Sequence, residues 1–224
     1  MENLQLLNKI LTSNNVHVNF LHEYSTNDNF HNWLNNLLPE IVDCKQQTQN
    51  HPWHIYGVLD HILHSIDNIN NQTQQLDSNT RLLLAYTMLL HDIAKPKCHI
   101  VRKKDGKWID GFFGHNIESS KIANRFAKNI NMDEKSTKIL VKLVLDHDIF
   151  MFIKDFPTTN PNWKQLTPEL VQNKINELNN YGDGKTLMTY LVMIGRSDNL
   201  AQNPAMTKES LAMLDKFDDI IQNL

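Results

Sequence analysis

The fold is decided by the segment LLLAYTMLLHDIAKP, which occupies residues 82–96. Its first nine residues are apolar apart from Thr87, which indicates a helix that is buried on all sides. That helix leads directly into His91 and Asp92. A buried carboxylate is costly unless a cation or hydrogen bonds compensate it, and a divalent metal ion is one such cation. The segment therefore predicts a buried helix that carries ionisable side chains for a chemical reason.

Helical periodicity covers most of the remaining chain. Apolar residues recur at steps of three and four along residues 55–69, 139–147, 187–198 and 211–221. The expected start signals are Ser78 before the buried helix, Asp133 before residue 134, and Thr167 followed by Pro168. These patterns predict a mainly α fold.

Residues 99–113 are the exception to the helical pattern. Apolar residues there flank Asp105-Gly106, a strong two-residue turn signal, so we predict one short β-hairpin. Residues 155–167 contain two prolines and are expected to form a loop.

Neither a repeat nor a linker divides the chain, so we predict a single domain over residues 1–224. Within it we expect a core over about 51–203, a helical extension over 1–50 and a C-terminal helix over 204–224. An amphipathic helix in the extension either completes the core or contacts a second copy of the chain. Its apolar residues are Phe30, Trp33, Leu34, Leu37 and Leu38.

Composition excludes several classes of protein. The formal net charge is -3, so a broad basic face that coats a polyanion is not expected. The seven glycines form neither a P-loop nor a dinucleotide fingerprint, and two cysteines argue against a disulfide framework. Without a signal-like N-terminus or an apolar run that could span a bilayer, we expect a soluble, cytoplasmic protein with no membrane partner.

Further ionisable residues occupy positions where a structural helix would place leucine. His147 follows Leu143 on its apolar stripe, Asp198 follows Ile194, and His61 lies within an equally apolar helix. Any one of them alone is best explained as a core residue with satisfied hydrogen bonds. Together with His91-Asp92, the set favours a metal site.

At this point the sequence resembles the HD superfamily of metal-dependent phosphohydrolases, most closely the HD domain of bacterial tRNA nucleotidyltransferases. The matching segments are HPWHIYGVLDH at 51–61, LLHDIAKP at 89–96, FGHNIESS at 113–120 and LVLDH at 143–147. The resemblance implies one metal held by His61, His91, Asp92 and Asp198. The chain departs from the family in two ways: no nucleotidyltransferase head precedes the domain, so nucleotide addition is not expected, and Gly57 and Gly195 fall inside predicted helices.

The resemblance also implies a second metal, held by His115 and His147 and bridged by Asp92. His115 follows Gly114 near a helix start, so it could equally cap the helix or bind a phosphate. Histidine and carboxylate ligands without thiolates suit Mn, Fe, Co, Ni or Zn and do not choose between them.

Three features near the ligands could serve a substrate. Lys95 could hold a phosphate oxygen, as a catalytic and substrate-binding residue beside Asp92, or simply be a solvated helix end. His54 precedes the first ligand helix and could contact a base or phosphate. Basic residues cluster at the hairpin and either protect a charged edge from aggregation or steer a substrate. They are Lys97, Arg102, Lys103, Lys104 and Lys107.

We therefore expect a metal-dependent phosphohydrolase that acts on a small phosphorylated substrate, either a nucleotide or a phosphoester of the phosphomonoester or 2',3'-cyclic type, with an RNA end also possible. Two alternatives stay open: a di-iron oxygenase of the same superfamily, and an inert module that binds a nucleotide or RNA. The sequence does not fix the substrate, the metal or the oligomeric state.

Overall fold

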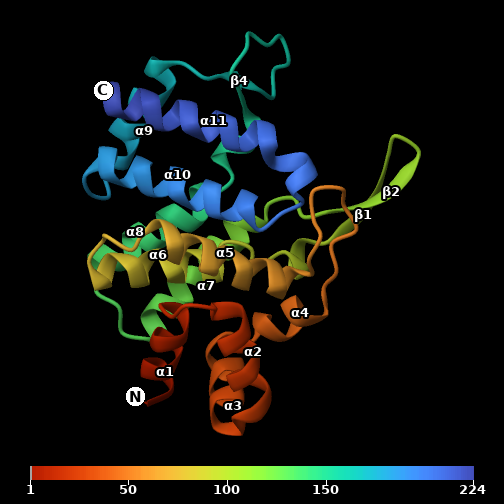
Figure 1. Cartoon of the computed structure of the whole chain (residues 1–224), viewed down its shortest axis with the longest axis vertical. Helices are drawn as coiled ribbons and strands as arrows, with labels where there is room; N and C mark the ends of the chain where they lie inside the picture. Colours follow the sequence, from red (N-terminus) through yellow and green to blue (C-terminus); the bar gives the residue numbers. More distant parts are fainter. Residues whose placement is uncertain (1) are drawn as a thin grey trace.

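Helices make up most of the chain in the computed structural model, which describes residues 2–224 (Figure 1). The mainly α prediction is confirmed. The helices are α1 (Glu2–Leu11), α2 (Val16–Thr26), α3 (Asp28–Leu37), α4 (Glu40–Gln46), α5 (Val58–Gln72), α6 (Ser78–Leu90), α7 (His115–Asn129), α8 (Glu134–Asp146), α9 (Pro168–Leu178), α10 (Gly184–Leu200) and α11 (Pro204–Asn223), with short 3-10 turns η1 (Pro96–Cys98) and η2 (Ile149–Phe152).

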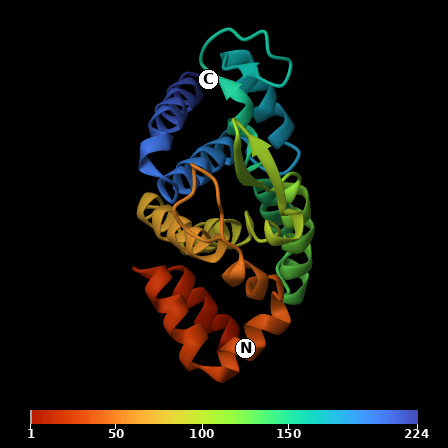
Figure 2. The same cartoon turned by 90° about the vertical axis from the view of Figure 1, so that its right-hand side faces the viewer.

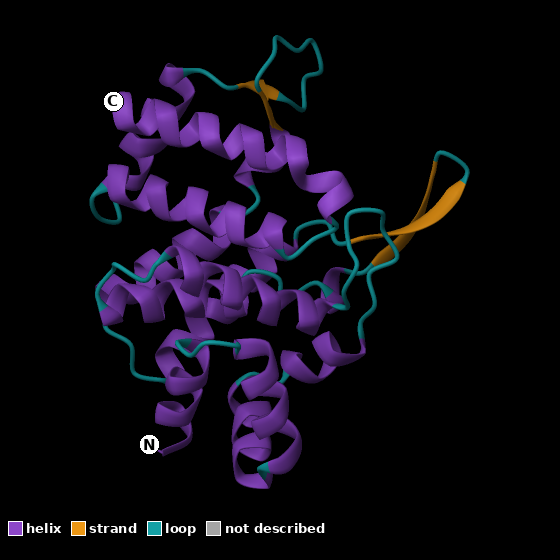
Figure 3. Ribbon diagram, in the orientation of Figure 1, coloured by secondary structure: helices purple, strands orange, loops and turns teal. Residues whose placement is uncertain are grey.

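The predicted hairpin is present and projects from the helices (Figure 3). Strands β1 (Ile100–Lys104) and β2 (Lys107–Gly111) pair in antiparallel register. Asp105 and Gly106 both have positive φ angles, 50° and 80°, as a type I′ turn requires.

The loop prediction for residues 155–167 needs one correction. Within that segment β4 (Lys164–Gln165) pairs in parallel with β3 (Ile153–Lys154). A strand of two residues is too short to produce an alternating pattern in the sequence. The fold therefore contains this pair of two-residue strands in addition to the β1–β2 hairpin.

The helices form three groups along the longest axis of the molecule. Helices α1–α4 occupy one end, α9–α11 the opposite end, and α5–α8 the middle (Figures 1 and 2). One hydrophobic core runs through all three groups, from Leu7 in α1 to Ile221 in α11. The predicted amphipathic segment contributes to it, because Phe30, Leu34 and Leu38 are fully buried. Within residues 2–224, none of the helices is long and apolar enough to cross a membrane.

Side-chain caps fix where α6, α8 and α9 begin. Asp133 caps α8 and Thr167 caps α9, each by accepting a backbone hydrogen bond, as predicted. The cap predicted at Ser78 is wrong by one residue, because the Asp77 carboxylate accepts from the first turn of α6 and Ser78 is already helical. An aspartate offers two acceptor oxygens where serine offers one.

The two glycines expected inside helices have different positions. Gly57 is the N-cap of α5 and therefore lies outside the helix. Gly195 does lie inside α10, where a Cβ atom would come within 2.8 Å of the Phe150 ring. Gly195 thus allows η2 to pack directly against the α10 backbone.

Candidate metal centre

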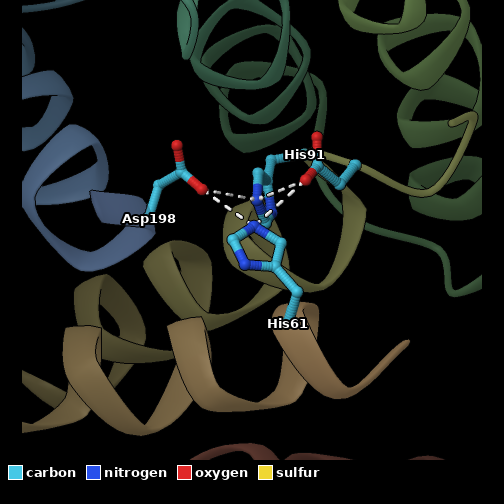
Figure 4. Close-up of side chains that lie close together, drawn as sticks. His61, His91 and Asp198 are labelled. Carbon is cyan, nitrogen blue, oxygen red and sulfur yellow. Dashed lines mark ion pairs between the residues drawn. The ribbon is translucent and has the colours of Figure 1, made fainter. Parts of the chain in front are cut away.

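The four ligands implied for the first metal come together in the middle of the molecule. His61 lies in α5, His91 and Asp92 follow the last residue of α6, and Asp198 lies near the end of α10. Figure 4 shows His61, His91 and Asp198 converging from these three elements. One ligand atom from each of the four residues lies within 4.8 Å of every other. Both histidines are completely buried, whereas the Asp198 side chain is 18% exposed.

Short distances join the imidazoles to the carboxylates. His61 Nε2 is 2.8 Å from Asp198 Oδ1 and 3.1 Å from Asp92 Oδ2. His91 Nε2 is 3.3 Å from the same Asp92 oxygen and 3.6 Å from Asp198 Oδ1. Two nitrogens and two oxygens therefore face one shared volume.

The backbone sets the orientation of each ring. His61 Nδ1 bonds the Ala201 carbonyl at 3.0 Å, and His91 Nδ1 bonds the Met88 carbonyl at 2.6 Å. A carbonyl oxygen only accepts, so Nδ1 must carry the hydrogen in both rings. In the neutral ring the lone pair is then on Nε2, which is the atom that faces the carboxylates. Such a bond on the far nitrogen is the usual support of a metal-binding histidine.

Unpaired buried atoms test whether a metal fits. Within residues 2–224, His61 Nε2, His91 Nε2 and Asp92 Oδ2 are buried and form no bond of good hydrogen-bond geometry, although they are close to one another and the Lys95 ammonium lies 2.6 Å from Asp92 Oδ2. Buried polar atoms in native proteins are almost always paired, and leaving one unpaired is costly. A cation among them would satisfy all three atoms at once. The donor set fits Mn, Fe, Co, Ni or Zn.

A second group of ligands lies on the other side of Asp92. Asp92 Oδ1 is 3.1 Å from His115 Nε2 and 3.7 Å from His147 Nε2, and the two Nε2 atoms are 3.2 Å apart. Both Nδ1 atoms bond backbone carbonyls, those of Phe112 and Val144. Of the alternatives for His115, capping is not observed, because the helix α7 has no side-chain cap and the His115 ring lies in this group.

Asp148 is the residue that sequence reasoning missed. Its Oδ2 atom is 3.2 Å from His115 Nε2 and its Oδ1 atom is 3.4 Å from His147 Nε2. The sequence does contain a signal for it, because His147-Asp148 follows the end of α8 as His91-Asp92 follows the end of α6. Each group then has two histidines, the shared Asp92 and one further aspartate that is partly exposed.

Lys95 is not a solvated helix end. The residue is buried, its Nζ atom is 2.6 Å from Asp92 Oδ2, and it donates to the Gln49 Oε1 atom at 3.0 Å. It also lies 5.5 Å from the centre of the Phe112 ring. The structure therefore places the amine against the carboxylate that the two groups share.

His54 lies beside the first group. Its ring is 5.6 Å from that of His61, and its Nδ1 atom is buried without a hydrogen-bond partner in the described chain. Burial, reinforced by the positive charge of Lys95, lowers the pKa of His54 to about 2. The ring is therefore neutral at ordinary pH.

Ion pairing controls the charges of the first group while no metal competes. Burial works against a charged His61, but Asp198 and Asp92 outweigh it and raise the pKa of His61 to about 9. The pKa of His91 rises to about 9 for the same reason, with Asp92 as the main cause that opposes burial. Burial would raise the pKa values of Asp92 and Asp198, but His91 and Lys95 hold that of Asp92 well below its usual range, and His61 and His91 do the same for Asp198.

Searches against models of protein families and against curated proteins find no match to this chain. The chemistry of the centre is therefore argued from its own residues. Six of the predicted site residues form the two ligand groups, while Lys95 and His54 lie directly beside them.

Proposed function

We propose that this protein is a metal-dependent phosphohydrolase of the HD superfamily that acts on a nucleotide or on a phosphoester of the phosphomonoester or 2',3'-cyclic type. The order of the ligands along the chain is the order that resembles this superfamily. The proposal assigns a role to each of the two ligand groups that share Asp92.

The observation that carries the proposal is the position of the Asp92 carboxylate. Its Oδ2 atom faces His61 and His91, and its Oδ1 atom faces His115 and His147. A carboxylate with one oxygen directed to each of two histidine pairs suits a bridge between two metal ions. Divalent ions held by these histidines and aspartates would supply Lewis acidity, which would activate water as a nucleophile and offset charge on the phosphoryl oxygens.

The protein's own residues then orient the substrate. His61 and His91 close the centre on the buried side, whereas Asp198 and Asp148 are 18% and 23% exposed, which leaves their side for a substrate to approach. The Lys95 ammonium could turn from Asp92 to a phosphoryl oxygen and hold it as a charged donor. Neutral His54 could bond a ribose or phosphate oxygen without adding charge.

The two alternatives are weaker on these residues. A di-iron oxygenase would use the same histidines and aspartates, but it has no evident need for an ammonium group against the bridging carboxylate. An inert binding module would tolerate the loss of a ligand, and all six ligands are kept and oriented.

The direct experiment measures phosphoester hydrolysis by protein loaded separately with Mn, Fe, Co, Ni and Zn. Suitable substrates are p-nitrophenyl phosphate and a nucleoside 2',3'-cyclic phosphate. We expect turnover that is lost in His91→Ala and Asp92→Ala but kept in His22→Ala, a matched change of an exposed histidine outside the centre. Oxygen consumption by the iron-loaded protein, without hydrolysis under any condition, would favour the oxygenase instead.

A further inference from the structure

The β1–β2 hairpin exposes a large aromatic side chain and several cations, of which Lys103 lies on the same face as the aromatic ring. Trp108 is 63% exposed and Val101 is 57% exposed. Lys103 is the direct cross-strand partner of Trp108, and Lys104 pairs with Lys107 next to the turn. The hairpin therefore combines a flat indole surface with ammonium groups in a part of the molecule that projects into solvent (Figure 3).

The positive charge of the hairpin is offset only in part, by Asp105 at the exposed turn. Within residues 2–224, none of its four cations forms an ion pair; they are Arg102, Lys103, Lys104 and Lys107. The acidic Asp110 is buried and is already engaged, because it accepts from the Asn50 backbone at 2.6 Å and lies 2.9 Å from His99 Nε2. The chain as a whole has a net charge of -3, so this local excess of cations stands against the general charge.

The base of the hairpin is tied to the segment that borders the metal centre. The Asn50 carbonyl accepts from the Asp110 backbone at 3.0 Å, and the Asn50 side chain donates to the Trp108 carbonyl at 3.1 Å. The same segment carries His51 and His54, whose rings are 6.0 Å apart.

A row of imidazole rings connects this segment to the metal centre. His54 lies next to His61, with 5.6 Å between the rings, so His51, His54 and His61 lead in sequence toward the first ligand group. Burial, with smaller contributions from the charges of Lys104 and Arg102, lowers the pKa of His51.

We propose that the β1–β2 hairpin binds a single-stranded nucleic acid and presents its end to the metal centre. Bases stack on exposed aromatic rings and phosphates pair with unneutralised cations, which is how sequence-tolerant single-strand sites work. Protection of a strand edge would explain the lysines but not a tryptophan that is 63% exposed. A second copy of the chain would bring like charges together on this face. The delivery of the end rests on the proposed function, whereas binding by the hairpin does not.

The test measures binding of a labelled single strand of about 12 nucleotides, as RNA and as DNA, by fluorescence anisotropy of the full chain. We expect Trp108→Ala to weaken binding about 5- to 100-fold, as for the loss of one stacking platform. In the triple variant Lys103→Gln, Lys104→Gln, Lys107→Gln, the slope of log affinity against log salt should fall by about 2. Binding of either strand supports the proposal, and the ratio of the two affinities tells whether a ribose 2'-hydroxyl is recognised.

Matched controls change the same residue types elsewhere. Trp163→Ala removes another accessible tryptophan, and the triple variant Lys164→Gln, Lys185→Gln, Lys208→Gln makes the same change in net charge at exposed positions outside the hairpin. Both controls should bind as the unchanged protein does. The proposal is overturned if the unchanged protein binds neither strand, or if the hairpin variants bind no more weakly than the controls.

Hydrolysis of a small phosphoester separates this proposal from the proposed function. The hairpin variants should hydrolyse p-nitrophenyl phosphate at the rate of the unchanged protein, because the small substrate does not need the hairpin. Hydrolysis with no hairpin-dependent binding would overturn the inference and leave the function standing. Hairpin-dependent binding without hydrolysis under any metal would retain the binding site and remove the function.

Discussion

At the scale of single residues, local backbone bonding determines which nitrogen each ligand offers. His91, His115 and His147 each bond the carbonyl oxygen three residues earlier in the chain, and His61 bonds the more distant Ala201 carbonyl. Three of the four rings are therefore oriented by a nearby carbonyl of their own segment and not by a distant contact. All four Nε2 atoms are left for the centre, which is why a common orientation arises inside α5, just after α6 and α8, and at the start of α7.

Asp148 should control the second metal and not the first. In Asp148→Asn the second group loses the carboxylate that lies 3.2 Å from His115 Nε2 and 3.4 Å from His147 Nε2. We expect bound metal to fall from two equivalents per chain toward one, as measured by elemental analysis after desalting. The control variant Asp60→Asn changes a half-exposed aspartate that precedes His61 in the sequence, and it should keep both equivalents of metal. Two tightly held equivalents in Asp148→Asn would exclude Asp148 as a ligand.

Replacement of Lys95 should lower turnover without weakening metal affinity. Lys95→Met removes a positive charge 2.6 Å from the shared carboxylate, so metal ions should bind as tightly as before or more tightly. Under the proposed function the variant also loses the charged donor to the phosphoryl oxygen, and kcat should then fall by about 10²-fold, the usual effect of losing one such donor. Metal titration and steady-state kinetics of Lys95→Met and Lys95→Arg test both effects. An unchanged kcat would leave Lys95 with a structural role only.

At the scale of elements, the sequence predicts the first ligand group better than the second. Helical periodicity places Asp198 on an apolar stripe and His61 within an apolar helix, and a buried helix end identifies His91-Asp92. In the second group periodicity singles out only His147, whereas His115 is implied by the resemblance alone. Asp148 lies beyond the end of α8, where periodicity stops, so only the repeated His-Asp arrangement after α6 and α8 could have indicated it. The cap at Asp77 and the two-residue pairing of β3 with β4 depend on one or two local bonds, which leave no periodic pattern.

Gly195 should be needed for the packing of η2 against α10. Alanine improves helix propensity by about 1 kcal/mol, but overpacking of a filled site costs about 1–3 kcal/mol. Because a Cβ atom would lie 2.8 Å from the Phe150 ring, we expect Gly195→Ala to lower the Tm by a few degrees. Thermal unfolding followed by circular dichroism measures this. Adding Phe150→Leu should recover part of the loss, whereas a higher Tm in Gly195→Ala alone would contradict the packing argument.

At the scale of the whole molecule, the metal-free protein should lose stability as the pH rises. The folded-state pKa values of His61 and His91 are about 9, above the value of about 6.5 in unfolded chains. Their contribution is therefore complete below pH 6.5 and is lost as the pH rises toward 9. The lowered pKa values of Asp92 and Asp198 act in the opposite sense, so their contribution is lost in acid.

Metal binding should reverse the alkaline loss. A metal ion competes with protons for the histidine Nε2 atoms, so its affinity and its stabilising effect should grow as those protons leave. We expect the increase in Tm caused by Mn²⁺, relative to protein treated with EDTA, to be larger at pH 9 than at pH 6. An increase that does not depend on pH would mean that the metal binds away from these histidines.

The central claim is that one carboxylate, that of Asp92, joins two metal sites. The most direct test is elemental analysis of the purified chain after incubation with Mn, Fe, Co, Ni or Zn and removal of unbound metal. We predict about two equivalents per chain, and a loss of both in Asp92→Ala, since each group uses one oxygen of that side chain. A protein that retains no metal under any of these conditions, or that keeps two equivalents without Asp92, would contradict the claim.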